Sequence, residues 1–152
     1  MKNSTLNKIL LSEAGVAALI LRVPVGLILA AHGAQKLFGW FDGYGLEGTA
    51  GWLSSIGLEP GYLMALMAGS AEFFGGLALV LGLLTRPAAL VAAFTMLVAI
   101  FSVHIGNGLF ASNDGYEYAL TLLVVTVSLA IQGGGYLSLD NMLAKNKSPS
   151  HH

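Results

Sequence analysis

Residues 62–104 read YLMALMAGSAEFFGGLALVLGLLTRPAALVAAFTMLVAIFSVH, and this stretch decides the fold. It holds two long apolar runs that are separated only by Thr85-Arg86-Pro87. The apolar core of a bilayer is about 30 Å thick, so a helix that crosses it needs about 20 mostly apolar residues. A proline is tolerated at the first position of a helix. The stretch therefore predicts two antiparallel membrane-spanning helices, the second of which begins at Pro87.

Two further apolar runs flank this pair, and the sequence as a whole predicts an all-α, polytopic membrane protein. We expect a four-transmembrane-helix bundle with spans at about 14–38, 62–84, 88–104 and 118–131. A cleaved signal peptide is the rival interpretation of the first span, but signal peptides have an apolar region of about 7–15 residues. This run is longer and contains Arg22. The expected organisation is a cytoplasmic segment (1–12), one membrane domain (13–143) and a polar tail (144–152).

The composition excludes an ordinary soluble domain. Of the 152 residues, 55% are hydrophobic and 10% are charged, whereas a typical globular domain has about 25% charged residues. The net charge of -1 does not favour binding to nucleic acid, which requires a basic surface. The chain has no cysteine, which excludes disulfides and thiolate-held metals or clusters. The sequence contains no haem, flavin or metal motif, and the partner it predicts is the lipid bilayer.

Lysine and arginine residues indicate the orientation of the bundle. Those outside the spans fall on one side: Lys2, Lys8, Arg86, Lys145 and Lys147. Segments 39–61 and 105–115, on the opposite side, contain neither residue type. Because positive residues concentrate in cytoplasmic segments, we expect both termini in the cytoplasm.

The first outer segment contains a further predicted helix. Apolar residues recur at near-helical spacing between Leu46 and Ile56, and Gly57 follows as a stop. A short interfacial helix over 47–56 is expected there. His151 and His152, in the tail, are either native or part of a purification tag, and we assign them no function.

Small residues recur along two of the spans. Ala68, Ala71, Gly75, Ala78 and Gly82 follow steps of three and four residues, and Gly26, Ala30 and Gly33 do so in the first span. Because small residues let helix backbones approach closely in lipid, this pattern predicts helix packing rather than chemistry.

Arg22 and Glu72 lie inside predicted spans. A charge near the middle of a membrane costs at least about 2.5–3.5 kcal/mol, so such residues face the bundle interior and find partners. The helix rise places Arg22 about 12 Å and Glu72 about 19 Å from the cytoplasmic ends of their spans. We expect them to meet. The pair is either a structural ion pair or a charged site for a quinone head group, a proton or a substrate anion.

A second polar group is predicted near the outer boundary of the membrane. The helix rise places His32 and His104 about 25–27 Å from the cytoplasmic ends of their spans. Glu117 begins the last span at a similar level, and Gln35 and Lys36 follow His32 by about one turn. Histidine and glutamate can ligate zinc, copper or iron, but these residues lack the spacing of a metal motif, so we predict a polar pocket without a metal.

Four segments carry a family resemblance: Arg22-x-x-x-Gly26, the run from His32 to Leu37, the run from Glu72 to Arg86, and the small-residue span that ends at His104. Together they resemble the DoxX family of small bacterial membrane proteins. The resemblance covers roughly residues 10–143, and its most specific part is the pattern E-x-x-G-G…G-L-x-T-R. It implies a four-helix protein of the bacterial cytoplasmic (inner) membrane, of a kind described as quinol oxidase or quinone oxidoreductase subunits. The motif match carries over Arg22, Lys36, Glu72, Arg86 and His104.

We therefore expect a membrane subunit of a redox system that interacts with quinone or quinol. The expected catalytic residues are Glu72, Arg22 and His104, and the expected cofactor-binding residues are His32, Gln35, Lys36, His104 and Glu117. A partner redox subunit or a second copy of the chain is expected beside it. Two alternatives remain at this point: a non-enzymatic anchor or assembly partner for stress- or metal-response proteins, and a small-molecule transporter. Whether the chain is itself an enzyme stays open.

Overall fold

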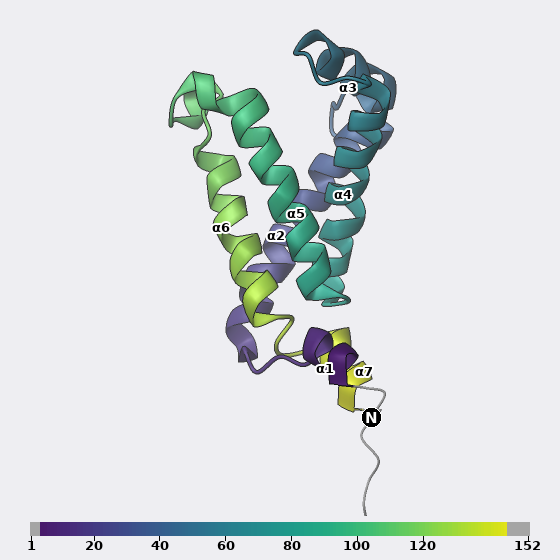
Figure 1. The fold of residues 1–152 in the computed structure, drawn as a ribbon, viewed down its shortest axis with the longest axis vertical. Helices are drawn as coiled ribbons and strands as arrows, with labels where there is room; N and C mark the ends of the chain where they lie inside the picture. The colour runs from purple at the N-terminus through teal and green to yellow at the C-terminus, as the bar shows by residue number, and fades with distance from the viewer. Residues whose placement is uncertain (1–3, 146–152) are drawn as a thin grey trace, which may run out of the picture.

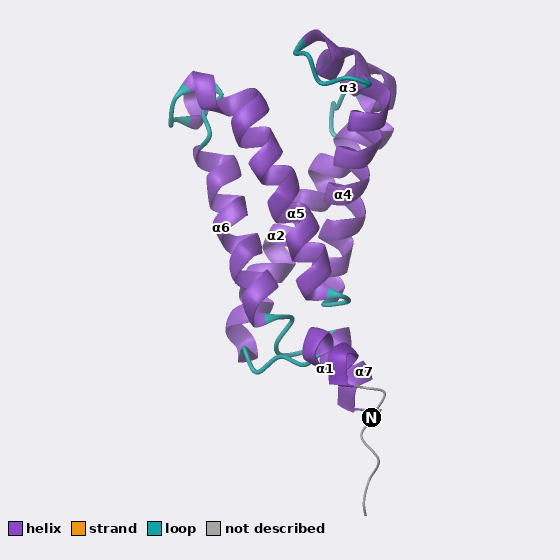
Figure 2. Ribbon diagram, viewed as in Figure 1, coloured by secondary structure: helices purple, strands orange, loops and turns teal. Residues whose placement is uncertain are grey.

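A computed structural model describes residues 4–145, and within this range the chain is helical and contains no strand (Figures 1 and 2). Lys2, Lys147, His151 and His152 lie outside the described residues. In chain order the α-helices are α1 (Ser4–Leu10), α2 (Gly15–Phe38), α3 (Gly45–Ser55), α4 (Gly61–Leu81), α5 (Thr85–Ala99), α6 (Glu117–Gln132) and α7 (Leu139–Lys145). Three short helical turns follow α5: a π-helix (Ile100–His104) and two 3-10 turns (Ile105–Asn107 and Ala111–Asn113).

Three helical segments of the described chain are long and apolar enough to cross a membrane. They are α2 with 24 residues, α4 with 21, and α5 together with the turns that continue it to Asn107, with 23. Helix α6 is apolar but has only 16 residues, which corresponds to a length of about 24 Å.

The helices form two pairs that diverge. Helix α2 packs along α4, and α5 packs along α6. The pairs lie close together at the end that carries α1 and α7, and they separate toward the end that carries α3 (Figure 1). We call these the lower end and the upper end. Between the pairs, the core is built from apolar side chains such as Leu29, Leu79, Met96 and Leu129.

Glycines bring the backbones of α2 and α4 into contact. A Cβ atom on Gly33 would lie 2.3 Å from the backbone nitrogen of Phe73, and one on Gly76 would lie 2.5 Å from that of Ala30. Gly75, which belongs to the predicted small-residue stripe, instead faces α5, since its nearest neighbour is the carbonyl oxygen of Ala88 at 3.8 Å. The small residues thus serve packing, but Gly76 rather than Gly75 forms the seam with α2.

The turn between α4 and α5 lies earlier than the sequence predicts. Gly82 caps α4 in the left-handed conformation, and Leu84 also has a positive φ of 48°. Helix α5 therefore begins at Thr85, and Pro87 falls within its first turn, where a missing N–H leaves no helical hydrogen bond unmade. Arg86 donates to the carbonyl groups of Ala130, Ile131 and Gln132, so that it caps the end of α6.

Helix α3 occupies the segment for which a short helix is expected. It buries Thr49, Ala50 and Leu53, and it packs on the beginning of α4 around Ala65. Ile56 lies just beyond the helix and is exposed.

Candidate functional site

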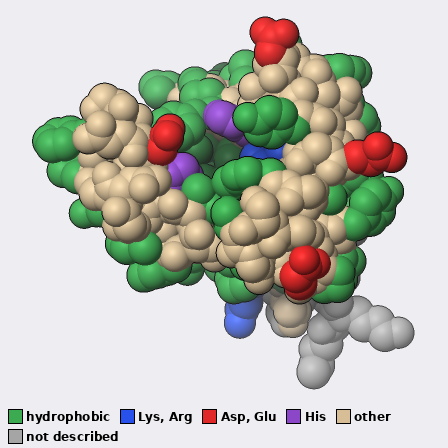
Figure 3. Space-filling view, turned by 90° about the horizontal axis from the view of Figure 1, so that it is seen from above, with side chains coloured by type: hydrophobic (Ala, Val, Ile, Leu, Met, Phe, Trp, Pro, Cys, Tyr) green, Lys and Arg blue, Asp and Glu red, His purple; other side chains and the backbone are tan. Residues whose placement is uncertain are grey.

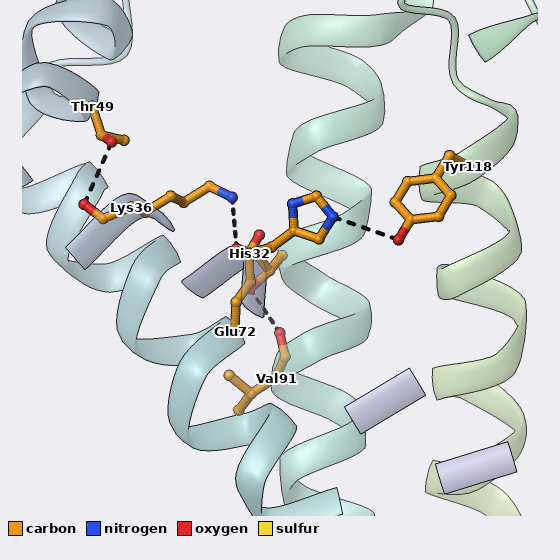
Figure 4. Close-up of polar contacts among 7 residues, drawn as sticks. His32, Lys36, Thr49, Glu72, Val91 and Tyr118 are labelled. Atoms are coloured by element: carbon orange, nitrogen blue, oxygen red, sulfur yellow. Dashed lines mark hydrogen bonds and ion pairs between the residues drawn. The ribbon is translucent and has the colours of Figure 1, made fainter. Parts of the chain in front are cut away.

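Lys36 and Glu72 form an ion pair between α2 and α4. The Lys36 Nζ atom lies 2.6 Å from Glu72 Oε2 (Figure 4). The side chain of Glu72 is 5% exposed and that of Lys36 is 28% exposed. The glycine seam places these two helices close enough for the pair to form. Glu72 thus has a basic partner, but that partner is Lys36 rather than the expected Arg22.

Arg22 lies toward the lower end, and its guanidinium group binds backbone only. Its Nε donates to the carbonyl oxygen of Gly134 at 2.9 Å. Its two Nη atoms donate to four further carbonyl groups, those of Leu79, Val80, Tyr136 and Leu137. Because arginine has five N–H donors, this set uses all of them. The expected Arg22–Glu72 pair is therefore wrong, and no donor of Arg22 remains for a ligand.

Asp140 adds a second set of backbone contacts at the lower end, and we call the contacts of Arg22 and Asp140 together the lower clamp. Its carboxylate accepts hydrogen bonds from the backbone nitrogens of Leu84 and Thr85, at 2.7 and 2.8 Å, and its side chain is fully buried. A carboxylate is well placed at a helix N-terminus, where free N–H groups and the helix dipole favour negative charge. The segment from Gly133 to Asp140 is therefore fixed to the ends of α4 and α5.

A cavity of about 110 Å³ lies between the diverging pairs. We call it the upper cavity; its lining residues are Leu29, His32, Lys36, Glu72, Met96, Ala99, His104, Tyr118, Ala119 and Leu122. Viewed from the upper end, histidine side chains lie on both sides of a hollow in which a basic side chain is visible (Figure 3). The structure thus places His32, His104, Lys36 and Glu72 around one space.

His32 approaches α6 through Tyr118. The His32 Nε2 atom and the Tyr118 hydroxyl oxygen are 3.5 Å apart, and the two rings are tilted with centroids 5.8 Å apart (Figure 4). Tyr118 is not among the site residues expected from the sequence. The signal was available, because Tyr118 lies four residues, about one helical turn, before the apolar Leu122. Leu122 is buried, so one face of α6 carries both residues toward the cavity.

His104 ends the π-helix that continues α5. Its Nδ1 atom lies 2.7 Å from the carbonyl oxygen of Asp114, in the connection to α6. The Nε2 atom of His104 takes no part in this contact. Single π-helical turns within α-helices are frequent at functional sites.

Besides Arg22, two further expected site residues do not line the upper cavity. Gln35 donates to the carbonyl oxygen of Phe41 at 3.1 Å and lines a neighbouring hollow. Glu117 accepts a hydrogen bond from the backbone nitrogen of Ala111 at 2.6 Å and so holds the α5–α6 connection. Within residues 4–145, no group of three or more histidine, cysteine, aspartate or glutamate side chains could hold a metal ion.

The chain is similar to several known proteins. The chain is 34% identical over 132 residues to a Bacillus subtilis (strain 168) protein named "Putative oxidoreductase CatD", covering 87% of this chain and 90% of the relative. It is 34% identical over 143 residues to the inner membrane protein YqjF of Escherichia coli (strain K12), covering 89% and 96%. It is 29% identical over 130 residues to the inner membrane protein YphA of the same organism, covering 82% and 89%. No solved structure matches the chain.

The DoxX family model matches residues 17–105, which is more than half of the chain. The matched region includes the α2–α4 seam, the Lys36–Glu72 pair and His104. The resemblance expected from the sequence motifs is confirmed: the chain belongs to the DoxX family of membrane proteins.

Proposed function

We propose that this protein is the membrane subunit of a redox system and that it binds a quinone or quinol head group in the upper cavity. The composition of that cavity carries the proposal: the Lys36–Glu72 pair and two histidines stand above an apolar floor of residues such as Leu29 and Met96. A ligand site of this kind combines apolar walls with a few polar groups that fix the orientation of the ligand. The oxidoreductase name of the Bacillus relative supports a redox role.

The residues of the cavity match the needs of such a ligand. A quinone has two carbonyl oxygens that accept hydrogen bonds, and its conversion to quinol takes up two electrons and two protons. Lys36 and His32 supply N–H donors at one wall, and His104 supplies a nitrogen at the other. Glu72 can accept a proton from Lys36, its hydrogen-bonded partner, and pass protons to and from the site. A partner redox subunit exchanges the electrons.

Arg22, Gln35 and Glu117 are left out of this proposed site. All five donors of Arg22 are used in the lower clamp. Gln35 and Glu117 are bonded to the backbone and lie outside the lining of the upper cavity. Glu72, His104, Lys36 and His32 are therefore the residues that the proposal retains.

We further propose that α2, α4, α5 and α6 form a four-helix bundle in the bacterial inner membrane, with both termini in the cytoplasm. The lower end carries Lys8, Arg86 and Lys145, and the connections at the upper end contain no lysine or arginine. This asymmetry is typical of a cytoplasmic lower end. Helix α3 then lies at the outer interface.

The proposal is tested by mass spectrometry of the lipids that co-purify with the protein, followed by titration of a tail-less and a long-tailed quinone in lipid nanodiscs. We expect quinone in the extract and saturable binding that Glu72→Gln and Lys36→Met weaken. The matched control variants are Glu117→Gln and Lys8→Met, which change the same residue types outside the cavity. A preparation that holds a stable protein partner but binds neither quinone would contradict the proposal and favour the anchor function. Substrate flux in liposomes without quinone binding would favour a transporter.

A further inference from the structure

A second hollow adjoins the upper cavity. We call it the side hollow; it has a volume of about 220 Å³ and is lined by Ile28, Ala31, His32, Gln35, Phe41 and Tyr118. His32 and Tyr118 line both spaces. The two side chains therefore stand between the side hollow and the polar centre of the upper cavity.

The side hollow lies at the depth of lipid. By the helix rise, Ile28 is about 20 Å and Gln35 about 30 Å from the start of α2, so the hollow lies along the upper half of that helix. Leu27 on α2 and Val124 on α6 are 55% and 61% exposed. The lining of the side hollow is mostly apolar, and the amide nitrogen of Gln35 points to the carbonyl oxygen of Phe41. Such a surface suits a hydrocarbon chain.

The contact that closes this side of the bundle is weak. The Tyr118 hydroxyl oxygen and His32 Nε2 are 3.5 Å apart, which is beyond the usual 2.7–3.2 Å of a protein hydrogen bond. The α2–α4 side differs, because backbone meets backbone at Gly33 and Gly76. Parting the His32 and Tyr118 side chains loses one marginal polar contact, whereas parting α2 from α4 would undo the glycine seam.

We propose that the side hollow is a lateral entrance from the bilayer to the upper cavity, with His32 and Tyr118 as its gate. The inference rests on the proposed function and narrows it: the ligand is a quinone with a long isoprenoid tail, dissolved in the membrane. Its head group passes between His32 and Tyr118 to reach the Lys36–Glu72 pair. Its tail remains in the side hollow and in the lipid beyond.

The absence of native cysteine permits a direct test. Ala99→Cys places a single thiol in the lining of the upper cavity. In nanodiscs, this thiol is offered a long-chain alkyl maleimide dissolved in the lipid or a small charged maleimide dissolved in water. Ala31→Trp fills the side hollow. Leu27→Trp, a lipid-facing residue of the same helix that lines neither space, is the matched control.

We expect Ala31→Trp to slow labelling by the alkyl maleimide at least about tenfold and Leu27→Trp to leave it unchanged, since blocking an access route acts on the association rate. Labelling by the charged maleimide should be equal in both variants. Should Ala31→Trp fail to fold, Ile28→Trp blocks the hollow from its lower edge. Equal alkyl labelling in the blocked and control variants would overturn the entrance.

Binding of the two quinones to the same variants distinguishes the lateral entrance from the proposed quinone function. Ala31→Trp should slow binding of the long-tailed quinone and spare the tail-less one. If the parent protein binds neither quinone while alkyl labelling still depends on the side hollow, the entrance is supported and the quinone function is wrong. If the parent binds both and Ala31→Trp slows neither, the quinone function is supported and the entrance is wrong.

Discussion

Lys36 and Glu72 form the single ion pair found within residues 4–145, with Nζ 2.6 Å from Oε2. The two residues come from different helices, α2 and α4, and are 36 positions apart in the chain. Glu72 is 5% exposed, and Lys36 is the basic group that contacts its carboxylate. The pair belongs to the wall of the upper cavity, and its two members should behave as one unit.

A double-mutant cycle tests this coupling. Removing one member of a buried pair costs about 3–5 kcal/mol, because the other charge is left uncompensated. We expect a smaller loss here, since the Lys36 side chain is 28% exposed. Glu72→Gln and Lys36→Met should each lower the thermal unfolding midpoint in detergent, and the double variant should recover part of the loss. Arg22→Leu combined with Glu72→Gln should be additive, and coupling between those two changes would contradict the structure.

Arg22→Lys should be strongly destabilising despite keeping the charge. Arg22 serves five carbonyl groups, whereas lysine has three donors. Each buried carbonyl left without a partner costs about 1–3 kcal/mol. Thermal unfolding of Arg22→Lys and of Arg22→Ala should therefore show large losses in both. A lysine variant as stable as the parent would mean that charge alone, rather than the hydrogen-bond geometry, holds the lower end.

The α2–α4 seam predicts opposite effects for two glycine changes. Gly76→Ala puts a Cβ 2.5 Å from backbone atoms of α2, and overpacking of this kind costs about 1–3 kcal/mol. Gly51→Ala, within α3, meets nothing within 4 Å and should gain about 0.5–1 kcal/mol from the higher helix propensity of alanine. The thermal unfolding midpoints of the two variants and of the parent protein, measured under the same conditions, test this prediction. Equal effects at the two positions would show that the helices do not approach as described.

His104→Phe should separate binding from folding. The His104 ring lines the upper cavity, and its Nδ1 atom is 2.7 Å from the carbonyl oxygen of Asp114. We expect normal membrane insertion and near-normal stability, with weaker quinone retention because a nitrogen at the head-group site is lost. Asn107→Ala is the control, since Asn107 donates to the same carbonyl oxygen at 3.3 Å and lies outside the cavity lining. If His104→Phe binds quinone as well as the parent protein does, His104 does not contribute to the binding site.

Topology can be checked with reporter fusions. Because the lower end carries the basic residues, we expect fusions at Asn113 to report the outer side of the membrane and fusions at Lys145 the cytoplasmic side. A cytoplasmic signal at Asn113 would reverse the proposed orientation.

Composition and apolar run length by themselves determine that the chain is helical and suited to a membrane. A run of about 20 apolar residues can satisfy its backbone in lipid only as a helix or within a closed barrel, and the spacing of small residues indicates where helices meet. Rise per residue is a property of the helix alone, so the sequence predicts a similar depth for His32, His104 and Lys36, and also for Gln35 and Glu117, which do not line the upper cavity. His32, His104 and Lys36 do line it.

Only the tertiary structure decided which charges meet. Arg22 and Lys36 both lie on α2, and depth along one helix axis does not say how that helix is rotated and seated against its neighbours. The position of α2 against α4 is set by glycine contacts such as that of Gly33 with Phe73. In this position Lys36, rather than Arg22, contacts Glu72. Arg22 found backbone carbonyls instead. Every residue carries the same backbone carbonyl group, so the side-chain pattern of the sequence could not predict which carbonyl groups Arg22 would bind.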